Sequence, residues 1–141
     1  MSVASCISGL CVAKNEADII EAMVRHNLGY LDTLHVVDHD SADATPLILS
    51  ALAAEFPDRL TWESDTTRGH VQTALINARV RPLLAETGAA QLVLLDADEF
   101  IRAEPKLFRD SLLASETPIL LRGGCGNLNS RDKWIFRVTA A

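Results

Sequence analysis

The stretch QLVLLDADEF, residues 91–100, decides the fold of this chain. Its apolar residues, 92–95, run without alternation, which is typical of a strand that is covered on both faces in a parallel sheet. The run ends in three acids within four residues, Asp96, Asp98 and Glu99. Because the carboxyl ends of strands in open α/β sheets border the ligand crevice, we expect all three acids to face that crevice.

Three carboxylates this close repel one another, and a divalent cation would remove the repulsion. Two like charges at about 4 Å cost on the order of 1 kcal/mol in water and about 4 kcal/mol at an effective dielectric of about 20. Oxygen ligands suit Mg²⁺ or Mn²⁺, usually held by one or two carboxylates and substrate phosphates. One interpretation of Asp96 and Asp98 is therefore an Asp-x-Asp metal–diphosphate site. The other is a solvated acidic turn in which Asp98 caps a short helix.

The composition is that of a globular protein, and it excludes several classes of function. The 141 residues fit one domain with its own core, and the net charge of −6, without a Lys or Arg cluster, argues against nucleic acid or an anionic membrane as a partner. No apolar run is long enough to span a bilayer. The N-terminus lacks the positive start of a signal peptide, and the three cysteines have no zinc-like spacing. We therefore expect reduced thiols and a cytoplasmic location.

Strand-like and helix-like segments alternate at the spacing of a doubly wound α/β sheet, mostly parallel and with helices on both faces. We expect strands at residues 5–13, 34–37, 59–63, 92–95 (the central one), 118–121 and 134–138. We expect helices at residues 19–28, 44–56, 71–86 and 104–114. Gly29 is the predicted C-terminal cap of the first helix, and Asp43 is the predicted N-cap of the second. No linker or repeat interrupts the pattern, so residues 1–141 form a single predicted domain.

Three of these strands end in polar clusters, and this coincidence favours a nucleotide and metal site. The clusters are Lys14-Asn15-Glu16, Asp38-His39-Asp40 and Asp96-Ala97-Asp98-Glu99. A crevice at strand ends would gather such groups, whereas a random surface would scatter them. His39 either contacts a ligand or belongs to a solvated loop.

Two stretches together resemble glycosyltransferase family 2. Residues 11–45, CVAKNEADIIEAMVRHNLGYLDTLHVVDHDSADAT, are followed further along the chain by LVLLDADEF, residues 92–100. The likeness covers about residues 6–101 and is to the nucleotide-sugar half of the family, in the subgroup with a Lys-Asn-Glu opening and an Asp-Ala-Asp-Glu-Phe core. The resemblance implies a GT-A fold and the transfer of a sugar from a UDP- or GDP-linked donor to an acceptor.

The resemblance also implies residues that bind the nucleotide-sugar. Carried over by position, Lys14, Asn15 and Glu16 would line the nucleotide loop after the first strand. Asp38 would contact the base or the ribose, and Asp40 would belong to the same binding set. A carboxylate suits this role because it can accept two hydrogen bonds from a base edge or a ribose diol.

A metal site follows from the same resemblance. Asp98 would ligate Mn²⁺ or Mg²⁺, and Asp96 would approach the ribose and the diphosphate and share in the metal site. The metal would neutralise charge on the departing diphosphate. A family segment near the donor phosphates corresponds in altered order to the residues around Arg68, Gln72 and Arg79. These three are further candidates, although a helix surface explains Arg79 about as well.

Family members usually continue well beyond the metal motif, whereas this chain ends soon after it. We therefore divide the domain into a nucleotide-sugar-binding half, 1–101, and a short remnant of the acceptor half, 102–141. No motif selects a catalytic base, and we take Asp132, which follows a glycine-rich stretch, as the candidate. A shortened sheet would leave apolar surface uncovered, so we also expect a homodimer.

Three functions are compatible with these residues. The first is a metal-dependent GT-A glycosyltransferase. The second is a non-catalytic or partner-dependent sugar-nucleotide-binding protein of the same fold. The third is a phosphatase with Asp96 as nucleophile, which we disfavour because that class carries Asp-x-Asp after its first strand, followed by Thr or Val. Here Glu99 and Phe100 follow the fourth strand.

Overall fold

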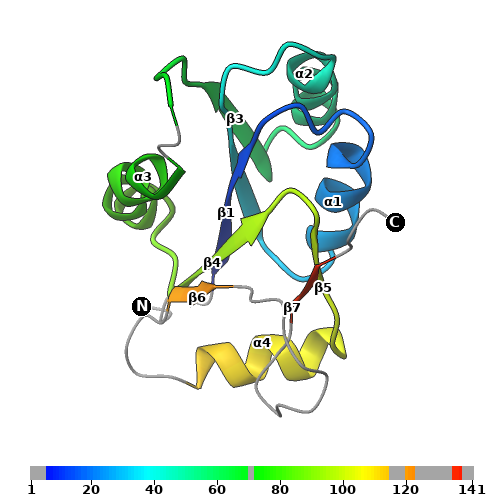
Figure 1. Ribbon diagram of the computed structural model, residues 1–141. Helices are drawn as coiled ribbons and strands as arrows, with labels where there is room; N and C mark the ends of the chain where they lie inside the picture. The colour runs from blue at the N-terminus through cyan, green and yellow to red at the C-terminus, as the bar shows by residue number, and fades with distance from the viewer. Residues whose placement is uncertain (1–5, 70–71, 115–119, 123–134, 138–141) are drawn as a thin grey trace.

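The computed structural model describes residues 6–69, 72–114, 120–122 and 135–137, and strands alternate with helices along residues 7–96 (Figure 1). In chain order the elements are β1 (Ile7–Ala13), α1 (Ile20–Asn27), β2 (Thr33–Asp38), α2 (Thr45–Glu55), β3 (Leu60–Ser64), α3 (Gln72–Thr87), β4 (Gln91–Asp96), β5 (Glu99–Ile101), α4 (Pro105–Leu113), β6 (Leu120–Arg122) and β7 (Ile135–Arg137). The candidate base Asp132 lies outside the described residues. Among the described helices, none combines the length and the apolar character that a bilayer crossing requires.

The larger sheet has the strand order β3-β2-β1-β4-β6, and each of its pairings is parallel. All seven residues of β1 are buried, as expected for a strand in the middle of a covered sheet. The prediction that residues 92–95 form the central strand is wrong, because β1 is central and β4 lies beside it. An apolar run indicates that a strand is buried on both faces. A strand beside the central one is buried in the same way, so the run does not distinguish the two positions.

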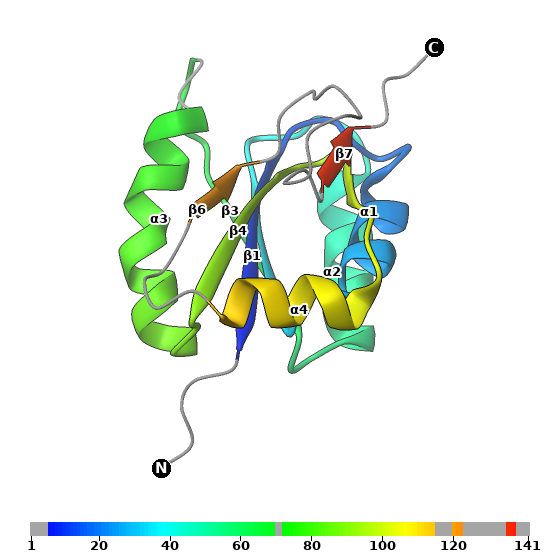
Figure 2. The ribbon, with the colours of Figure 1, turned by 90° about the horizontal axis from the view of Figure 1, so that it is seen from below.

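Helices cover both faces of this sheet, which confirms the predicted α/β layering (Figure 2). On one face, Met23 of α1, Leu49 of α2 and Phe108 of α4 belong to one buried apolar cluster. On the other face, Leu75 and Leu83 of α3 pack in a second, smaller cluster. The sheet therefore separates two cores of unequal size.

The strand order reverses between β1 and β4. The chain moves from β1 outward to β2 and β3, and then returns to place β4 on the other side of β1. β1 and β4 pair in parallel from Ile7 and Gln91 to Val12 and Asp96. In open α/β sheets such a switch point, at the carboxyl ends of the strands, is where ligands bind. The fold thus brings the polar residues after β1 and after β4 to one place.

A second sheet, not predicted from the sequence, pairs β5 with β7 in antiparallel register. The chain passes from β4 to β5 through a two-residue turn, Ala97 and Asp98. No helix starts at this turn, so Asp98 is not a helix cap. The next helix, α4, begins later and is capped by Glu104, whose side chain accepts hydrogen bonds from the backbone N–H groups of Lys106 at 3.2 Å and Leu107 at 2.7 Å.

Both predicted caps of the first two helices are displaced. Leu28, not Gly29, stands at the C-terminal cap of α1, with ordinary right-handed backbone angles (φ −64°, ψ −14°). Ala44, not Asp43, stands at the N-cap position of α2. Asp43 still supports the start of the helix from one residue earlier, since its Oδ1 accepts a hydrogen bond from the backbone N–H of Thr45 at 2.9 Å.

Candidate functional site

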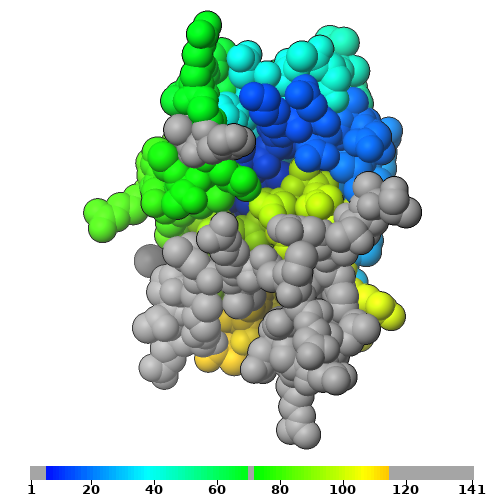
Figure 3. All heavy atoms as spheres, viewed as in Figure 1, coloured from blue at the N-terminus to red at the C-terminus, as the bar shows by residue number. Residues whose placement is uncertain are grey.

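A cavity of about 670 Å³ opens at the carboxyl ends of β1 and β4. Its volume lies within the usual range for small-molecule sites, about 300–1,000 Å³. The lining comes from the end of β1 and its following loop, from the residue after β2, from the start of α3, and from the turn after β4. Figure 3 shows the β1–α1, α3 and β4–β5 segments meeting on one face of the molecule.

Four of the predicted site residues line this cavity together: Lys14, Glu16, Asp96 and Asp98. Three of these side chains are carboxylates, and Lys14 is the single Lys or Arg among the described residues of the lining. Gln72 also lines the cavity, and its Nε2 donates a hydrogen bond to Asp96 Oδ1 at 3.0 Å. The cavity is therefore polar and negatively charged.

The carboxylates affect the titration of their neighbours. Burial is the largest cause of a raised pKa at Glu16, and the charge of Asp98 is the next largest. Burial also raises the pKa of the Cys11 thiol well above its ordinary value, and the charges of Asp96, Glu16, Glu99 and Asp98 raise it further. A raised pKa means that the anionic form is disfavoured at these positions. The end of β1 thus has a negative potential that favours a cation.

The expectation that Glu99 faces the crevice is wrong. The residue is 2% exposed, and its Oε1 accepts a hydrogen bond from the backbone N–H of Asp96 at 2.9 Å. This hydrogen bond spans the turn formed by Ala97 and Asp98, and the Glu99 side chain lies on its buried side. The motif divides its acids between two tasks: Asp96 and Asp98 line the cavity, and Glu99 shapes the turn that carries them.

Helix α1 supports the same turn through Asn27, a residue that we did not predict to matter for the site. The Asn27 side chain is fully buried. Its Nδ2 donates to the carbonyl oxygen of Glu99 at 2.9 Å, and its Oδ1 accepts from the backbone N–H of Ile101 at 2.9 Å. Buried backbone groups need such partners. The one sequence signal is a polar residue on the apolar face of a helix.

The loops after β1 and β2 are joined by reciprocal hydrogen bonds. The backbone N–H of Asn15 donates to Ser41 Oγ at 2.8 Å, and Asn15 Oδ1 accepts from the backbone N–H of Ala42 at 2.7 Å. The backbone N–H of Glu16 donates to Thr45 Oγ1 at 3.0 Å. Asn15 has left-handed backbone (φ 54°), which Asn tolerates better than most residues. It is not in the cavity lining, and its side chain shapes the loop that presents Lys14 and Glu16.

Asp38 and Asp40 flank the cavity residue His39 and are outside the lining. Asp38 is 1% exposed, and its Oδ2 accepts a hydrogen bond from the backbone N–H of Ser41 at 3.3 Å. Its Oδ1 is buried and has no hydrogen-bond partner among the described residues. Asp40 is exposed and has left-handed backbone (φ 51°). A buried acceptor without a donor costs free energy, so Asp38 Oδ1 favours a donor from outside the described residues.

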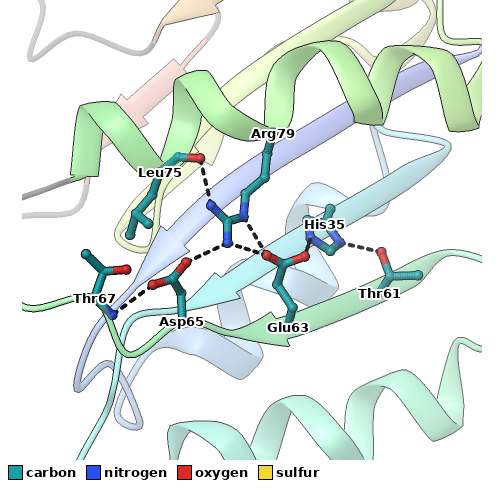
Figure 4. Close-up of polar contacts among 7 residues, drawn as sticks. All are labelled: His35, Thr61, Glu63, Asp65, Thr67, Leu75 and Arg79. Carbon is teal, nitrogen blue, oxygen red and sulfur yellow. Dashed lines mark hydrogen bonds and ion pairs between the residues drawn. The ribbon is translucent and has the colours of Figure 1, made fainter.

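The candidate phosphate-binding arginines lie away from the cavity lining. Arg79 of α3 donates to Glu63 Oε1 at 2.5 Å and to Asp65 Oδ2 at 2.7 Å (Figure 4). Hydrogen bonds from Thr67 and from the Arg79 guanidinium hold the pKa of Asp65 at about 2. Arg68 is exposed and is not part of the lining. Of the three candidates near the third helix, Gln72 is the one at the cavity.

The donor set of the cavity suits Mg²⁺ or Mn²⁺. Asp96, Asp98 and Glu16 offer oxygen atoms, the ligand type that these ions prefer. Within the described residues, no group of three or more His, Cys, Asp or Glu side chains is arranged to hold a metal by itself. A site with one or two carboxylates that substrate phosphates complete needs no such group. The residues present fit a metal that binds together with a phosphate ligand.

Comparison with known proteins found no protein-family model and no curated protein that matches this chain. The cavity and the chemistry of its lining are therefore the basis for assigning a function. Two observations bear most directly on function. The cavity lies at the switch point of a parallel sheet, and two carboxylates, those of Asp96 and Asp98, line it at the end of β4.

Proposed function

We propose that this chain is a metal-dependent glycosyltransferase of the GT-A type, which binds a nucleoside-diphosphate sugar and transfers the sugar to an acceptor. The observation that carries the proposal is the position of Asp96 and Asp98 in the cavity at the β1–β4 switch point. A diphosphate has the same sign of charge as these carboxylates, so the two are compatible in one cavity when a cation lies between them. The resemblance of the Lys-Asn-Glu and Asp-Ala-Asp-Glu-Phe motifs to family 2 supports the same assignment.

In this proposal Asp98 holds the metal, with Asp96 as the second carboxylate. The metal, when bound, supplies Lewis acidity toward the diphosphate that leaves the sugar. Gln72 holds the Asp96 carboxylate in a fixed orientation through the 3.0 Å hydrogen bond. Lys14 adds an ammonium group for a phosphate oxygen. Glu16 increases the negative potential that attracts the cation.

Asp38 is the proposed contact for the nucleoside. Its buried Oδ1 lacks a donor among the described residues, and a ribose hydroxyl or a base N–H would supply one. Asp38 ends β2 and directly precedes the cavity residue His39. Asn15, and Asp40 on the exposed side, belong to the loops after β1 and β2 and support the nucleoside site indirectly.

Calorimetric titration of UDP and of GDP, each with and without Mn²⁺, tests the proposal. We expect one of them to bind only in the presence of Mn²⁺, and we expect Asp98→Asn to weaken that binding on the order of 100-fold, since it removes a charged ligand of the metal. Asp58→Asn is the matched control. Asp58 is an exposed acid that precedes the amino end of β3, whereas the cavity lies at the carboxyl ends of the strands. Metal-independent binding, or no binding of either nucleotide at millimolar concentration, would contradict the proposal.

Turnover separates transfer from binding alone. A transferase should release the nucleoside diphosphate slowly from a bound UDP- or GDP-sugar even when water is the acceptor, as the sugar–phosphate bond breaks and water takes the sugar. A binding protein of the same fold would bind the donor without releasing product. Light scattering tests the proposed homodimer, and the mass of a single chain would contradict it.

A further inference from the structure

Residues 65–69 follow β3 and lead toward α3, and Gly69 at their end lines the cavity. The start of this segment is anchored twice. The backbone N–H of Asp65 donates to the carbonyl oxygen of Asp38 at 2.8 Å, and Asp65 Oδ2 accepts from Arg79 Nη2 at 2.7 Å. Figure 4 shows this second anchor reaching down from α3. Further along, the segment depends on a different contact.

That contact is made by His39. The residue is fixed at the carboxyl end of β2, since its backbone N–H donates to the carbonyl oxygen of Ala13 at 2.8 Å, and it is 7% exposed. Its Nε2 donates a hydrogen bond to the carbonyl oxygen of Thr67. A carbonyl oxygen only accepts, so this ring nitrogen carries a hydrogen. His39 thus joins the sheet to the middle of residues 65–69.

The position of the segment matters for the carboxylates on the far side of the cavity. α3 starts with Gln72, only three residues after Gly69, and the Gln72 side chain donates to Asp96 Oδ1 at 3.0 Å. Thr73 lines the cavity beside it. Arg79 of the same helix is bonded to Asp65 at the start of the segment, so a displacement of residues 65–69 would also displace α3 and lengthen the Gln72–Asp96 contact.

We infer that His39 is a positioning residue: by holding Thr67, it keeps residues 65–69 against the sheet and so sets the distance between Gln72 and Asp96. The consequence for ligand binding rests on the proposed function. The consequence for the segment itself rests on the His39–Thr67 hydrogen bond alone. The two consequences can be measured separately.

Trypsin provides the first measurement, because Arg68 is exposed and lies within the segment. His39→Leu removes the donor at similar side-chain size, and His39→Gln keeps a side-chain N–H that can reach a carbonyl. We expect cleavage after Arg68 to become about tenfold faster in His39→Leu and to stay near the wild-type rate in His39→Gln, since local opening controls the rate. His26→Leu is the control, because it removes a histidine-to-carbonyl bond of 2.5 Å between α1 and Ile101 and should leave this cleavage unchanged.

The dissociation constant for UDP or GDP with Mn²⁺ provides the second measurement. We expect it to rise about tenfold in His39→Leu and to return to within about threefold of wild type in His39→Gln. Arg79→Met is a second variant that releases Asp65. Arg79 does not line the cavity, so any change in the dissociation constant acts through residues 65–69 or through α3, which Arg79 also joins to Glu63. Urea unfolding of each variant shows whether the native fold is retained.

Each outcome supports or overturns the inference. If the wild-type protein binds neither nucleotide, the proposed function fails, and the cleavage rates decide alone whether His39 holds the segment. If the wild type binds and His39→Leu matches it in both measurements, the inference is overturned. Faster cleavage with an unchanged dissociation constant also overturns it. Weak binding in His39→Gln with normal cleavage would make His39 a ligand contact and overturn the positioning role.

Discussion

The two walls of the cavity are held in different ways. The carboxylate wall, which is the turn after β4, depends on two buried hydrogen bonds made by Asn27 and on a partly buried one that Glu99 accepts from the Asp96 N–H. The α3 wall depends on ion pairs of Arg79 with acids on β3 and after it, and on the His39–Thr67 bond. The helix that supports the carboxylate wall is also the more deeply buried one. Four of the eight residues of α1 are buried, whereas only Leu75 and Leu83 are buried among the sixteen residues of α3.

This difference indicates which wall is preorganised. Removing one member of a buried polar network leaves its partners unsatisfied, at about 1–3 kcal/mol for each group. Ion pairs near the surface contribute about 0–1 kcal/mol and weaken in salt. The backbone of the turn that carries the carboxylates is therefore fixed before a ligand arrives, whereas the α3 wall, with its Gln72 contact to Asp96, can adjust to it. A fixed position suits residues that bind a metal, and freedom to adjust suits a wall that closes on a substrate.

The largest expected effect comes from the carboxylate wall. Asn27→Leu keeps the size of the side chain but leaves the Glu99 carbonyl and the Ile101 N–H without their partner. We expect a loss of about 2–4 kcal/mol in the free energy of unfolding, measured by urea denaturation. Asn77→Leu, at an exposed position of α3, should stay within about 0.5 kcal/mol of wild type. A loss below about 1 kcal/mol for Asn27→Leu would remove the contrast between the walls.

A smaller effect is expected when the ion pairs of the α3 wall are removed. Arg79→Met should lower the free energy of unfolding by about 1 kcal/mol, because the Arg79 side chain is partly exposed (18%) and solvent screens its pairs with Glu63 and Asp65. The loss should shrink in about 1 M NaCl, where charges are screened within about 3 Å. Arg81→Met, at an exposed position of the same helix, serves as the control. A loss that does not depend on salt would show that packing dominates.

The pH dependence of stability should reveal the hydrogen bonds that Thr67 and Arg79 make to Asp65. Asp65 titrates with a pKa of about 2 in the folded protein, below its ordinary value of 3.8, because Thr67 and Arg79 hydrogen-bond to its charged form. Its contribution is therefore complete above its ordinary pKa and is lost as the pH falls toward 2. The difference in unfolding midpoint between wild type and Asp65→Asn should narrow over this interval. In an Arg79→Met background the difference should be smaller above pH 3.8, where Asp65 is charged.

The smallest effect is a gain in stability. Glu16→Gln removes a carboxylate whose pKa is raised by burial and by Asp98. A raised pKa for an acid means that its charged form destabilises the fold as the pH rises above the ordinary value of 4.5. We expect Glu16→Gln to be more stable than wild type by less than about 0.5 kcal/mol at neutral pH and without metal. The gain should disappear at acidic pH, and a loss at neutral pH would contradict the repulsion.

The sequence predicted the fold better than it predicted the roles of individual residues in the site. Because burial and periodicity are local properties of the chain, apolar runs and helical spacing predicted the four helices and the strands of the larger sheet, but not β5. The central position of β1 depends on which strands pair, and a run such as residues 92–95 does not encode that. Likewise, Asp-Ala-Asp-Glu does not reveal that Glu99 turns inward. Asn27 and Gln72 acquire their partners only when segments far apart in the chain meet.

Mn²⁺ electron paramagnetic resonance tests the central claim most directly, because the signal of free Mn²⁺ falls when the ion binds. We predict little loss of signal with the protein alone, since two carboxylates give an incomplete metal site. A large loss should appear when UDP or GDP is added with the protein, beyond that caused by the nucleotide alone, and it should be absent in Asp98→Asn. Equal loss with and without the protein, or equal loss in Asp98→Asn, would contradict a metal–diphosphate site in this cavity.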